Sequence, residues 1–458
     1  MNRRQFLFSA AAAFAPPARR PNIVLILADD LGWADTTPYG GDLHETPNLE
    51  RLAAQGMRFT HAYAAAPVCS PTRASIHTGK YPARLHITIW REAAHNPPRN
   101  RAVVPPMAEE DLPQRDCTLA EALRDNGYFT AHIGKWHLGN AENYPEVHGF
   151  DVNIGGTLWG APQTYFWPYR GSKRFGGEYR YVPGLHGGKP EEYLTDRLTT
   201  EAINQIDAAG GRPFFLNLCH HAVHTPIEGK PALVERYKSR IRPGLRHQNA
   251  AYAAMVQNLD ENVGRILDHL DRRGLASNTA VIFFSDNGGY INQVTDNYPL
   301  RSGKGSLYEG GIRVPLIVRW PGITRAGSAS AQRVCSTDLY PTILEAAALR
   351  GDPAQNAAMD GRSVANLLRD PSATLSRDEL FFHYPHYYHT TTPVSAIIAR
   401  DWKLLEYLED GRVELYNLAA DPSETRDLAR ENSALAEKLR ARLHAWRAEV
   451  KAQMPARP

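Results

Sequence analysis

Short runs dominated by apolar residues recur along the first two thirds of the chain, at residues 23–28, 128–133, 213–218 and 280–284. Such runs are typical of strands that are buried on both faces, as in the parallel sheets of α/β proteins. A further run at residues 314–318 follows a glycine-rich loop. The pattern therefore predicts a parallel sheet inside the molecule.

Segments with helical periodicity separate these strands. Thr46 and Pro47 have the pattern of a helix start, and residues 118–126 form another helix that Gly127 closes. A longer helix, residues 249–273, carries apolar side chains at helical spacing: Met255, Leu259, Val263, Ile266, Leu267 and Leu270. The alternation of strands and helices predicts an α/β fold, with a large, mostly parallel central sheet and helices on both faces.

The pattern changes after about residue 375. Three short antiparallel strands and then a polar helix are expected there, at residues 395–399, 402–408, 413–416 and 433–453. We therefore expect a catalytic domain over residues 21–375, followed by a small C-terminal α+β subdomain with a short antiparallel sheet over residues 376–458.

The first residues have the pattern of an export signal. Arg3 and Arg4 precede a short apolar stretch that ends in Ala13-Phe14-Ala15. We expect a signal peptide of the twin-arginine type over residues 1–20, and hence a periplasmic or secreted protein. The apolar stretch is too short to cross a bilayer, so no stable membrane association is expected.

Composition narrows the class of protein further. Of the 458 residues 43% are hydrophobic and 22% are charged, which is ordinary for a globular protein, and the net charge is only +3. No basic run is interleaved with aromatic residues, so no nucleic-acid partner is expected. The four cysteines lie far apart and suggest neither a zinc cluster nor a disulfide scaffold: Cys69, Cys117, Cys219 and Cys335.

Hard polar side chains directly follow four of the expected strands. In chain order they are Asp29 and Asp30, Lys135 and His137, His220, His221 and His224, and Asp286 and Asn287. A glycine-rich loop adds Lys304. Because the carboxyl ends of parallel strands meet at one edge of a sheet, we expect a single shared site there.

The acidic and amide side chains of this set offer oxygen ligands alone. Asp29, Asp30, Asp286 and Asn287 would therefore favour calcium or magnesium over zinc, which prefers imidazole and thiolate ligands. The three histidines after the third strand do not by themselves show which one faces the site.

A helix start is also expected at Cys69. Ser70 has the pattern of an N-cap and Pro71 that of a first helical residue. Cys69 would then lie just ahead of the helix N-terminus, where an anion is favoured. One turn of helix could bring the guanidinium of Arg73 back beside the thiol.

The run C-x-P-x-R from Cys69, followed by A-S-x-x-T-G up to Gly79, resembles the signature of the type I sulfatases. The similarity extends from Pro21 to residues 414–418. It implies an alkaline-phosphatase-like fold and a sulfuric ester hydrolase. In that family the cysteine is converted to formylglycine (3-oxoalanine) by a formylglycine-generating enzyme. The hydrated aldehyde attacks sulfur and then expels sulfate by regenerating its carbonyl group.

The resemblance also implies roles, residue by residue. Calcium would be held by Asp29, Asp30, the modified Cys69, Asp286 and Asn287. The catalytic residues would be Cys69, Arg73, Lys135, His137, His224 and Lys304. Both lysines would bind sulfate oxygens, His137 would hold the aldehyde hydrate, and His224 would protonate the leaving alcohol. His224 stands in V-H-T-P, where the family often has P-H-x-P.

A sulfated saccharide is the expected substrate. Aromatic clusters that suit sugar rings occur at residues 159–169 and 383–389, and residues 148–156 are similar to bacterial polysaccharide sulfatases that act on sulfated galactose units. One alternative is a phosphonate or phosphate monoester hydrolase of the same fold, although two lysines and one calcium suit a monoanionic sulfate ester better. Another is a catalytically inactive protein that binds sulfated glycans.

Overall fold

A nine-stranded sheet lies at the centre of the computed structural model, which describes residues 20–458. Its strand order is β4-β3-β5-β1-β6-β7-β2-β8, and β9 pairs with β2. The strands are β1 (Asn22–Ala28), β2 (Met57–Tyr63), β3 (Phe129–Gly134), β4 (Val152–Ile154), β5 (Phe214–Cys219), β6 (Thr279–Ser285), β7 (Arg313–Arg319), β8 (Ser328–Ser330) and β9 (Val334–Cys335). The expected strands are confirmed as β1, β3, β5, β6 and β7.

The sheet is mixed but mostly parallel. The neighbours β3, β5, β1 and β6 run parallel to one another, whereas β7 is antiparallel to β6 and β2 is antiparallel to β7. β2 was not expected, because Arg58, Thr60 and His61 interrupt its apolar positions. It lies near one side of the sheet, and these three side chains are only partly buried.

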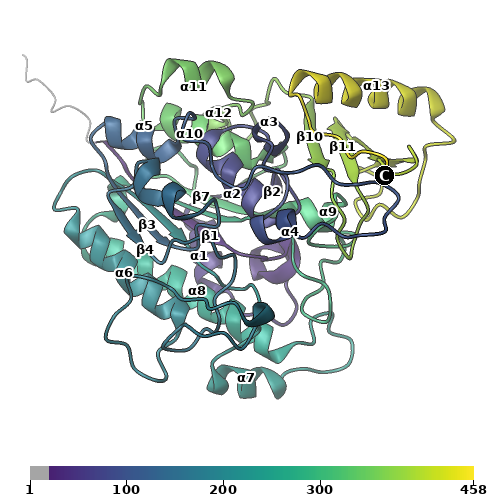
Figure 1. Ribbon diagram of the computed structural model, residues 1–458. Coiled ribbons are helices and arrows are strands. Elements are labelled where there is room, and N and C mark those ends of the chain that lie inside the picture. Colours follow the sequence, from purple (N-terminus) through teal and green to yellow (C-terminus); the bar gives the residue numbers. More distant parts are fainter. Residues whose placement is uncertain (1–19) are drawn as a thin grey trace, which may run out of the picture.

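Helices cover both faces of the sheet (Figure 1). One face packs against α1 (Pro47–Gln55), α6 (Leu194–Ala208) and α8 (Ala250–Arg272), and the other against α2 (Cys69–Thr78), α5 (Leu119–Asp125) and α10 (Leu339–Ala346). Successive residues of a strand point to opposite faces, so Val24 and Ile26 pack with the first group and Leu25 and Leu27 with the second. This two-sided burial explains the apolar sequence of β1.

Shorter helices lie in the connections. They are α3 (Pro82–Leu85), α4 (Arg91–His95), α7 (Pro231–Lys238), α9 (Glu309–Ile312), α11 (Pro353–Ala358) and α12 (Ala365–Arg369). The long helix α8 begins at the expected place, because the side chain of Asn249 accepts a hydrogen bond from the backbone N–H of Tyr252.

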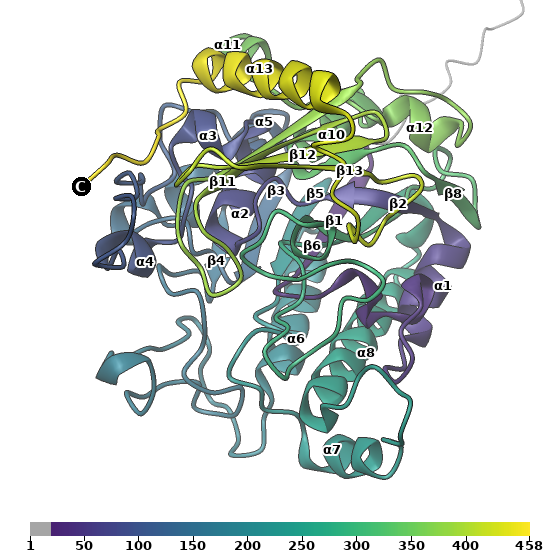
Figure 2. The same ribbon diagram turned by 90° about the vertical axis from the view of Figure 1, so that its right-hand side faces the viewer.

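A second, antiparallel sheet follows near the C-terminus. It consists of β10 (Glu379–Tyr384), β11 (Val394–Ala399), β12 (Trp402–Tyr407) and β13 (Val413–Asn417), and α13 (Ser433–Glu449) covers one of its faces (Figure 2). Trp446 of α13 stacks on Phe381 with ring centroids 4.8 Å apart. The three expected strands are confirmed, and β10 precedes them. The boundary between two domains at residue 375 stays a prediction.

Two further expectations concern the ends and the cysteines. The predicted signal peptide lies almost wholly outside the described residues. Within residues 20–458 no helix combines the length and the apolar character needed to cross a bilayer. All four cysteines, which fall in this part of the chain, are free thiols.

Candidate active site

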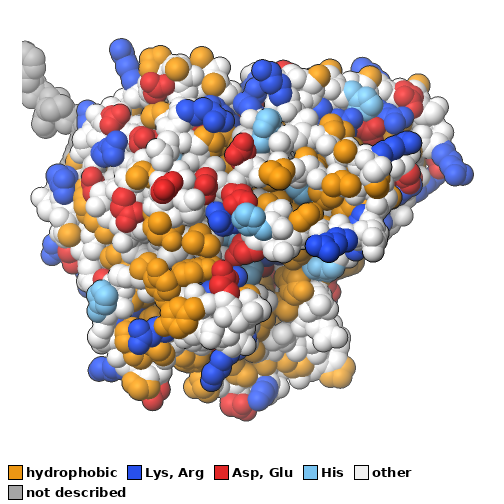
Figure 3. All heavy atoms as spheres, viewed as in Figure 1, with side chains coloured by type: hydrophobic (Ala, Val, Ile, Leu, Met, Phe, Trp, Pro, Cys, Tyr) orange, Lys and Arg blue, Asp and Glu red, His pale blue; other side chains and the backbone are white. Residues whose placement is uncertain are grey.

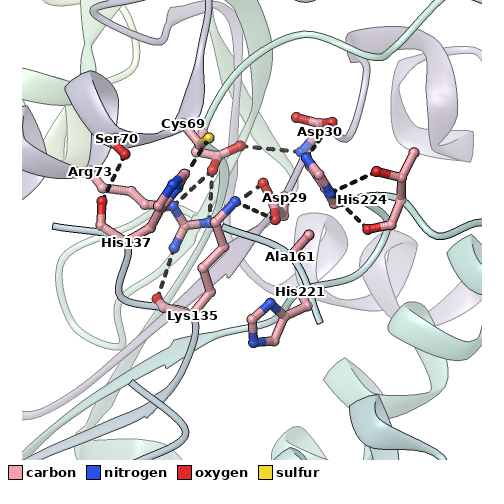
Figure 4. Close-up of polar contacts among 12 residues, drawn as sticks. Asp29, Asp30, Cys69, Ser70, Arg73, Lys135, His137, Ala161, His221 and His224 are labelled. Atoms are coloured by element: carbon pink, nitrogen blue, oxygen red, sulfur yellow. Dashed lines mark hydrogen bonds and ion pairs between the residues drawn. The ribbon is translucent and has the colours of Figure 1, made fainter. Parts of the chain in front are cut away.

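The polar strand ends meet at one edge of the central sheet, as expected. β1, β3, β5 and β6 are neighbours and run in the same direction, so the residues that follow them converge (Figure 4). A cavity of about 660 Å³ opens there, and its lining includes Asp30, Cys69, His137, His224 and Lys304. The backbones of Asp30 and His137 turn sharply after their strands, with φ of 59° and 60°. Left-handed conformations at non-glycine residues are uncommon and are often found at functional sites.

Cys69 is the first residue of α2, and Val68 is the residue before the helix. The prediction that Ser70 caps this helix is wrong: its hydroxyl instead donates a hydrogen bond to the carbonyl oxygen of His137, at 2.7 Å. Pro71 is tolerated because the N–H groups of the first turn have no partner within a helix. The Cys69 side chain thus lies at the positive end of the helix dipole.

The surroundings of Cys69 favour a negative charge. Its Sγ lies 3.4 Å from Nδ1 of His137. Burial by itself raises the pKa of the thiol, but Lys135 and His137 outweigh that effect and lower the pKa to about 6. Position 69 is therefore one where a nucleophilic oxygen or sulfur would be stabilised as an anion.

Arg73 contacts the acidic residues rather than the thiol. Its Nε and Nη2 donate to Oδ2 of Asp286 at 2.9 and 2.7 Å, and its Nη1 donates to the carbonyl oxygen of Lys135 at 3.0 Å. No hydrogen bond joins Arg73 to Cys69 in residues 20–458. Burial lowers the pKa of Arg73, but Asp286, Asp29 and also Cys69 outweigh it and raise the pKa, so the thiol lies within reach of the Arg73 charge. Arg73 is almost fully buried, so it fixes the strand ends of β3 and β6 relative to each other.

Four of the five expected metal ligands lie close together, with ligand atoms of Asp29 and Asp30 within 4.8 Å of each other and Asp286 and Asn287 in contact with Asp30. The backbone N–H of Asp30 donates to Oδ1 of Asp286 at 3.2 Å, and Nδ2 of Asn287 donates to Oδ1 of Asp30 at 2.8 Å. Oδ1 of Asp29 and Oδ1 of Asn287 are buried, yet neither accepts a hydrogen bond within residues 20–458. Buried oxygens of this kind normally have a partner. The set fits a hard divalent cation such as calcium, which binds carboxylate and amide oxygens.

The three carboxylates of Asp29, Asp30 and Asp286 are offset by three cations: Arg73, Lys135 and Lys304. Nζ of Lys135 lies 2.7 Å from Oδ2 of Asp29, and Nζ of Lys304 lies 2.7 Å from Oδ2 of Asp30. Burial raises the pKa of Asp29 well above its ordinary value. At Asp30 burial acts in the same direction, but Lys304 and His224 outweigh it and lower the pKa. Further positive charge close to Asp29 would therefore favour its ionised form in this buried place.

The three histidines that follow β5 differ in their surroundings. Only His224 lines the cavity among them, and its Nε2 lies 3.5 Å from Oδ2 of Asp30. Its Nδ1 lies 2.9 Å from the carbonyl oxygen of Thr225, which can only accept, so Nδ1 carries the proton. His220 and His221 are buried, and burial lowers the pKa of both rings. They are neutral side chains of the interior.

Sequence reasoning missed Glu92, which lies in the short helix α4. Oε2 of Glu92 lies 3.2 Å from Nε2 of His137, and Oε1 lies 3.3 Å from Nη2 of Arg180. Burial raises the pKa of Glu92, but the contact with His137 outweighs it and lowers the pKa to about 2. No motif surrounds Glu92 or Arg180, so only the folded chain brings them to the cavity.

At two glycines, side chains that line the cavity pack directly against the backbone. A Cβ atom at Gly160 would lie 2.3 Å from Cε1 of His137, so the ring packs directly on the backbone there. At Gly305, with φ of +87°, a Cβ atom would lie 2.0 Å from Cδ1 of Tyr388. A side chain at either position would displace a neighbour that lines the cavity.

Comparison with known proteins places this geometry in a family. The model of the Sulfatase family matches residues 21–349, and that of "N-sulphoglucosamine sulphohydrolase, C-terminal" matches residues 303–450. A protein named Sulfatase from Formosa agariphila is 34% identical, over 93% of this chain and 89% of its own. The N-acetylgalactosamine-6-sulfatase of Canis lupus familiaris is 36% identical, over 82% of this chain and 71% of its own.

Solved structures give the same result. The crystal structure of Ps i-CgsB matches with a TM-score of 0.80 at 31% identity and covers 93% of each chain. The structure of Ps i-CgsB in complex with k-i-k-neocarrahexaose matches with a TM-score of 0.79 at 30% identity, again over 93% of each chain. The family match, the relatives and the shared alkaline-phosphatase-like fold agree: this chain belongs to the sulfatase family and is a sulfatase.

Proposed function

We propose that this sulfatase hydrolyses sulfate monoesters of a saccharide, through a formylglycine at position 69 and a bound calcium ion. The position of Cys69 carries the proposal. Cys69 begins α2 within the C-x-P-x-R pattern and faces the cavity beside His137. The oxygens of Asp29 and Asn287 that accept no hydrogen bond from the described residues support the calcium ion.

The lysines of the site have donors to spare for a sulfate group. An ammonium group has three N–H donors, and each of Lys135 and Lys304 forms an ion pair with a single carboxylate, Asp29 or Asp30. The remaining donors can bind sulfate oxygens and offset the charge that grows on them in the transition state. When present, the formylglycine hydrate supplies the nucleophilic hydroxyl, and calcium supplies positive charge for the sulfate oxygens.

The two cavity histidines have separate tasks. His137 is held at both ring nitrogens, with Nδ1 facing position 69 and Nε2 facing Glu92, so it can hold a proton of the nucleophile at Nδ1. His224 presents Nε2 to the cavity. Burial and Lys304 lower the pKa of His224 to about 3. A bound anionic ester raises that pKa, and Nε2–H then protonates the leaving alcohol.

The names of similar proteins support a sulfated saccharide as substrate. The relative from Canis lupus familiaris is an N-acetylgalactosamine-6-sulfatase, and Ps i-CgsB has been crystallised with a neocarrahexaose. The cavity suits such a ligand, because aromatic side chains and charged groups line it together.

Maturation and export complete the proposal. Conversion of Cys69 requires a formylglycine-generating enzyme. The Arg3-Arg4 pair supports export by the twin-arginine route to the periplasm or beyond, and this route carries folded proteins, so conversion can precede transport. Replacement of both arginines by lysine should leave the precursor in the cytoplasm. Normal amounts of the mature form outside the cytoplasm would show that another route is used.

Turnover of small esters tests the activity directly. The protein is produced with and without a formylglycine-generating enzyme and assayed with 4-nitrophenyl sulfate and 4-nitrophenyl phosphate. We expect preference for the sulfate ester, and an aldehyde in place of the thiol in the mass spectrum of the Cys69 peptide. Cys69→Ala should abolish turnover without unfolding the protein, whereas the matched variant Cys117→Ala should keep it.

Three outcomes would contradict the proposal. Full activity from protein whose Cys69 is wholly unmodified would exclude the formylglycine mechanism. Faster turnover of the phosphate ester would favour a phosphate or phosphonate monoester hydrolase. A converted protein that binds sulfated saccharides but turns over neither ester would instead be an inactive glycan-binding protein.

A further inference from the structure

A second cavity, of about 370 Å³, adjoins the active-site cavity. Trp90 and Tyr388 line both cavities, and their rings meet edge to face with centroids 5.8 Å apart. Asn96 also lines both. The second cavity therefore begins on the far side of an aromatic wall of the first.

The lining of the second cavity is mainly apolar and aromatic. It includes Ile89, Ala93, Ala94, Pro97, Pro105 and Tyr387. The guanidinium of Arg101 lies over the Tyr387 ring, 5.1 Å from its centroid. Within residues 20–458, no carboxylate forms an ion pair with Arg101. Figure 3 shows apolar side chains on this face of the molecule between α4 and α13.

Contacts with the rest of the protein hold these rings in place. The hydroxyl of Tyr387 donates to Oε1 of Glu409 at 2.5 Å and accepts from the backbone N–H of Val103 at 3.2 Å. The Tyr388 ring lies against Gly305, the residue after Lys304. The aromatic wall is thus fixed relative to a lysine that faces the sulfate position.

We propose that this second cavity, named here the Tyr387 subsite, binds the sugar unit next to the sulfated one in a saccharide chain. This inference rests on the proposed function. A pyranose ring presents C–H groups that pack on aromatic faces, and its hydroxyls can reach the polar side chain of Asn96. Arg101 at the rim pairs with an anionic substituent of that sugar, such as a second sulfate. The occupant is the same chain that enters the active site, because the two cavities share a wall.

The test compares a small ester with an oligosaccharide. Values of kcat/KM are measured for 4-nitrophenyl sulfate, which is too short to reach the Tyr387 subsite, and for carrageenan and chondroitin-sulfate hexasaccharides. The readout is the ratio of the hexasaccharide value to the small-ester value, so losses of folding or of ester chemistry cancel. Tyr387→Ala should lower this ratio about tenfold, because an aromatic packing face is lost.

Matched variants separate the contribution of the Tyr387 ring to this ratio from that of its hydroxyl and from a nonspecific effect of charge. Tyr387→Phe keeps the ring and should keep the ratio near that of the wild type. Arg101→Ala should lower it about fivefold, an effect at the upper end for an exposed ion pair. Arg400→Ala, at a side chain that is 78% exposed outside both cavities, should leave the ratio unchanged.

The outcomes distinguish this inference from the proposed function. An unchanged ratio in both Tyr387→Ala and Arg101→Ala would overturn the subsite. So would a wild-type enzyme that hydrolyses 4-nitrophenyl sulfate but neither hexasaccharide. Loss of turnover of both kinds of substrate by converted wild-type protein would instead contradict the proposed function. As a second measurement, the hexasaccharide that the wild type desulfates should bind the inert Cys69→Ala protein more tightly than Cys69→Ala/Tyr387→Ala.

Discussion

Two of the buried ion clusters among the described residues differ in whether they face a cavity. In the active site, Lys135 and Lys304 each form an ion pair with one aspartate. Between the two sheets, Lys403 of β12 contacts two carboxylates, Glu309 at 3.1 Å and Glu424 at 2.9 Å. Glu309 also accepts a hydrogen bond from a tyrosine hydroxyl at 3.0 Å. All of these lysines are buried. Asp30 and Lys304 of the active-site cluster line the cavity of about 660 Å³, whereas Lys403, Glu309 and Glu424 line neither of the two cavities described above.

The difference shows that a buried ion pair alone does not mark a functional site. The Lys403 cluster joins β12 to α9, and its residues line neither of the two cavities described above. Both clusters hold buried oxygens without hydrogen bonds in residues 20–458, namely Oδ1 of Asp29 and Oδ1 of Asn287 in the active site and Oε1 of Glu424 in the Lys403 cluster, so the position beside a cavity makes the difference. Spare donors and acceptors that converge on a cavity are therefore the better criterion for function.

Asp286→Asn provides the strongest test of the active-site cluster. This change keeps an oxygen for Arg73 but removes the negative charge on a proposed calcium ligand. Because metal binding and charge stabilisation are lost together, kcat/KM for 4-nitrophenyl sulfate should fall about a thousandfold. Turnover and elemental analysis measure the two effects. Stoichiometric zinc in the native protein would contradict the assignment of calcium.

Asp286→Ala should in addition destabilise the fold. Arg73 would keep only Asp29, 3.8 Å away, as a carboxylate partner. Loss of one partner from a buried pair costs about 3 kcal/mol or more in free energy of unfolding, so Asp286→Asn is the cleaner variant.

In the Lys403 cluster, Lys403→Met should lower stability and leave turnover nearly unchanged. It leaves Glu309 and Glu424 buried without their shared cation, so the free energy of unfolding should fall by about 3–5 kcal/mol. Turnover at 25 °C should change little, because Lys403 is not a residue of the cavity lining. Denaturant unfolding and kcat/KM are measured side by side. Lys238→Met, at a side chain that is 59% exposed, is the matched control and should be near neutral.

A loss of turnover by Lys403→Met without any loss of stability would remove the distinction between the two clusters. It would mean that the second cluster acts on the site, for example through the Lys304 loop, whose carbonyl oxygen accepts a hydrogen bond from Thr390 at 2.8 Å.

Glu92→Gln examines the outer part of the active site. Glu92 holds Nε2 of His137, and loss of its charge should lower kcat about tenfold to a hundredfold. KM should change less, because Glu92 acts through His137 rather than on the sulfate group. Glu110→Gln is the matched control, since Glu110 contacts Arg91 and His95 of α4 but not His137. Equal effects of both variants would mean that Glu92 only stabilises α4.

A smaller effect concerns pH and a histidine outside both ion clusters. Nε2 of His132 donates to the carbonyl oxygen of Gly134 at 3.1 Å, and Nδ1 accepts from Asn217 at 3.0 Å. Burial lowers the pKa of His132 to about 3, from 6.5. Below pH 6.5 the unfolded chain therefore takes up a proton that the folded ring does not, and the free energy of unfolding should fall.

The expected size is about 2 kcal/mol at pH 5 for this ring. It is measured as the difference in unfolding free energy between pH 7 and pH 5, with and without His132→Gln. If the variant shows the same difference as the wild type, His132 is not the source of the pH dependence.

Local sequence determined much of the fold and of the inner site. The apolar runs predicted β1, β3, β5 and β6 because each strand is buried on both faces. Their polar ends could be assigned to one site because parallel strands share a carboxyl edge. The pattern around Cys69 predicted the nucleophile position and, through the resemblance, the family. In each case neighbouring residues in the chain carry the signal.

Tertiary structure decided the rest, because the remaining partners are distant in sequence and lie in segments without a motif. It directed the hydrogen bonds of Arg73 to Asp286 and to the carbonyl oxygen of Lys135. It selected His224 from three histidines by exposing only that ring to the cavity among the three. It brought Glu92 to His137 and packed Tyr388 on Gly305 through long-range contacts. Such contacts depend on how whole elements pack, and no local pattern of side chains encodes them.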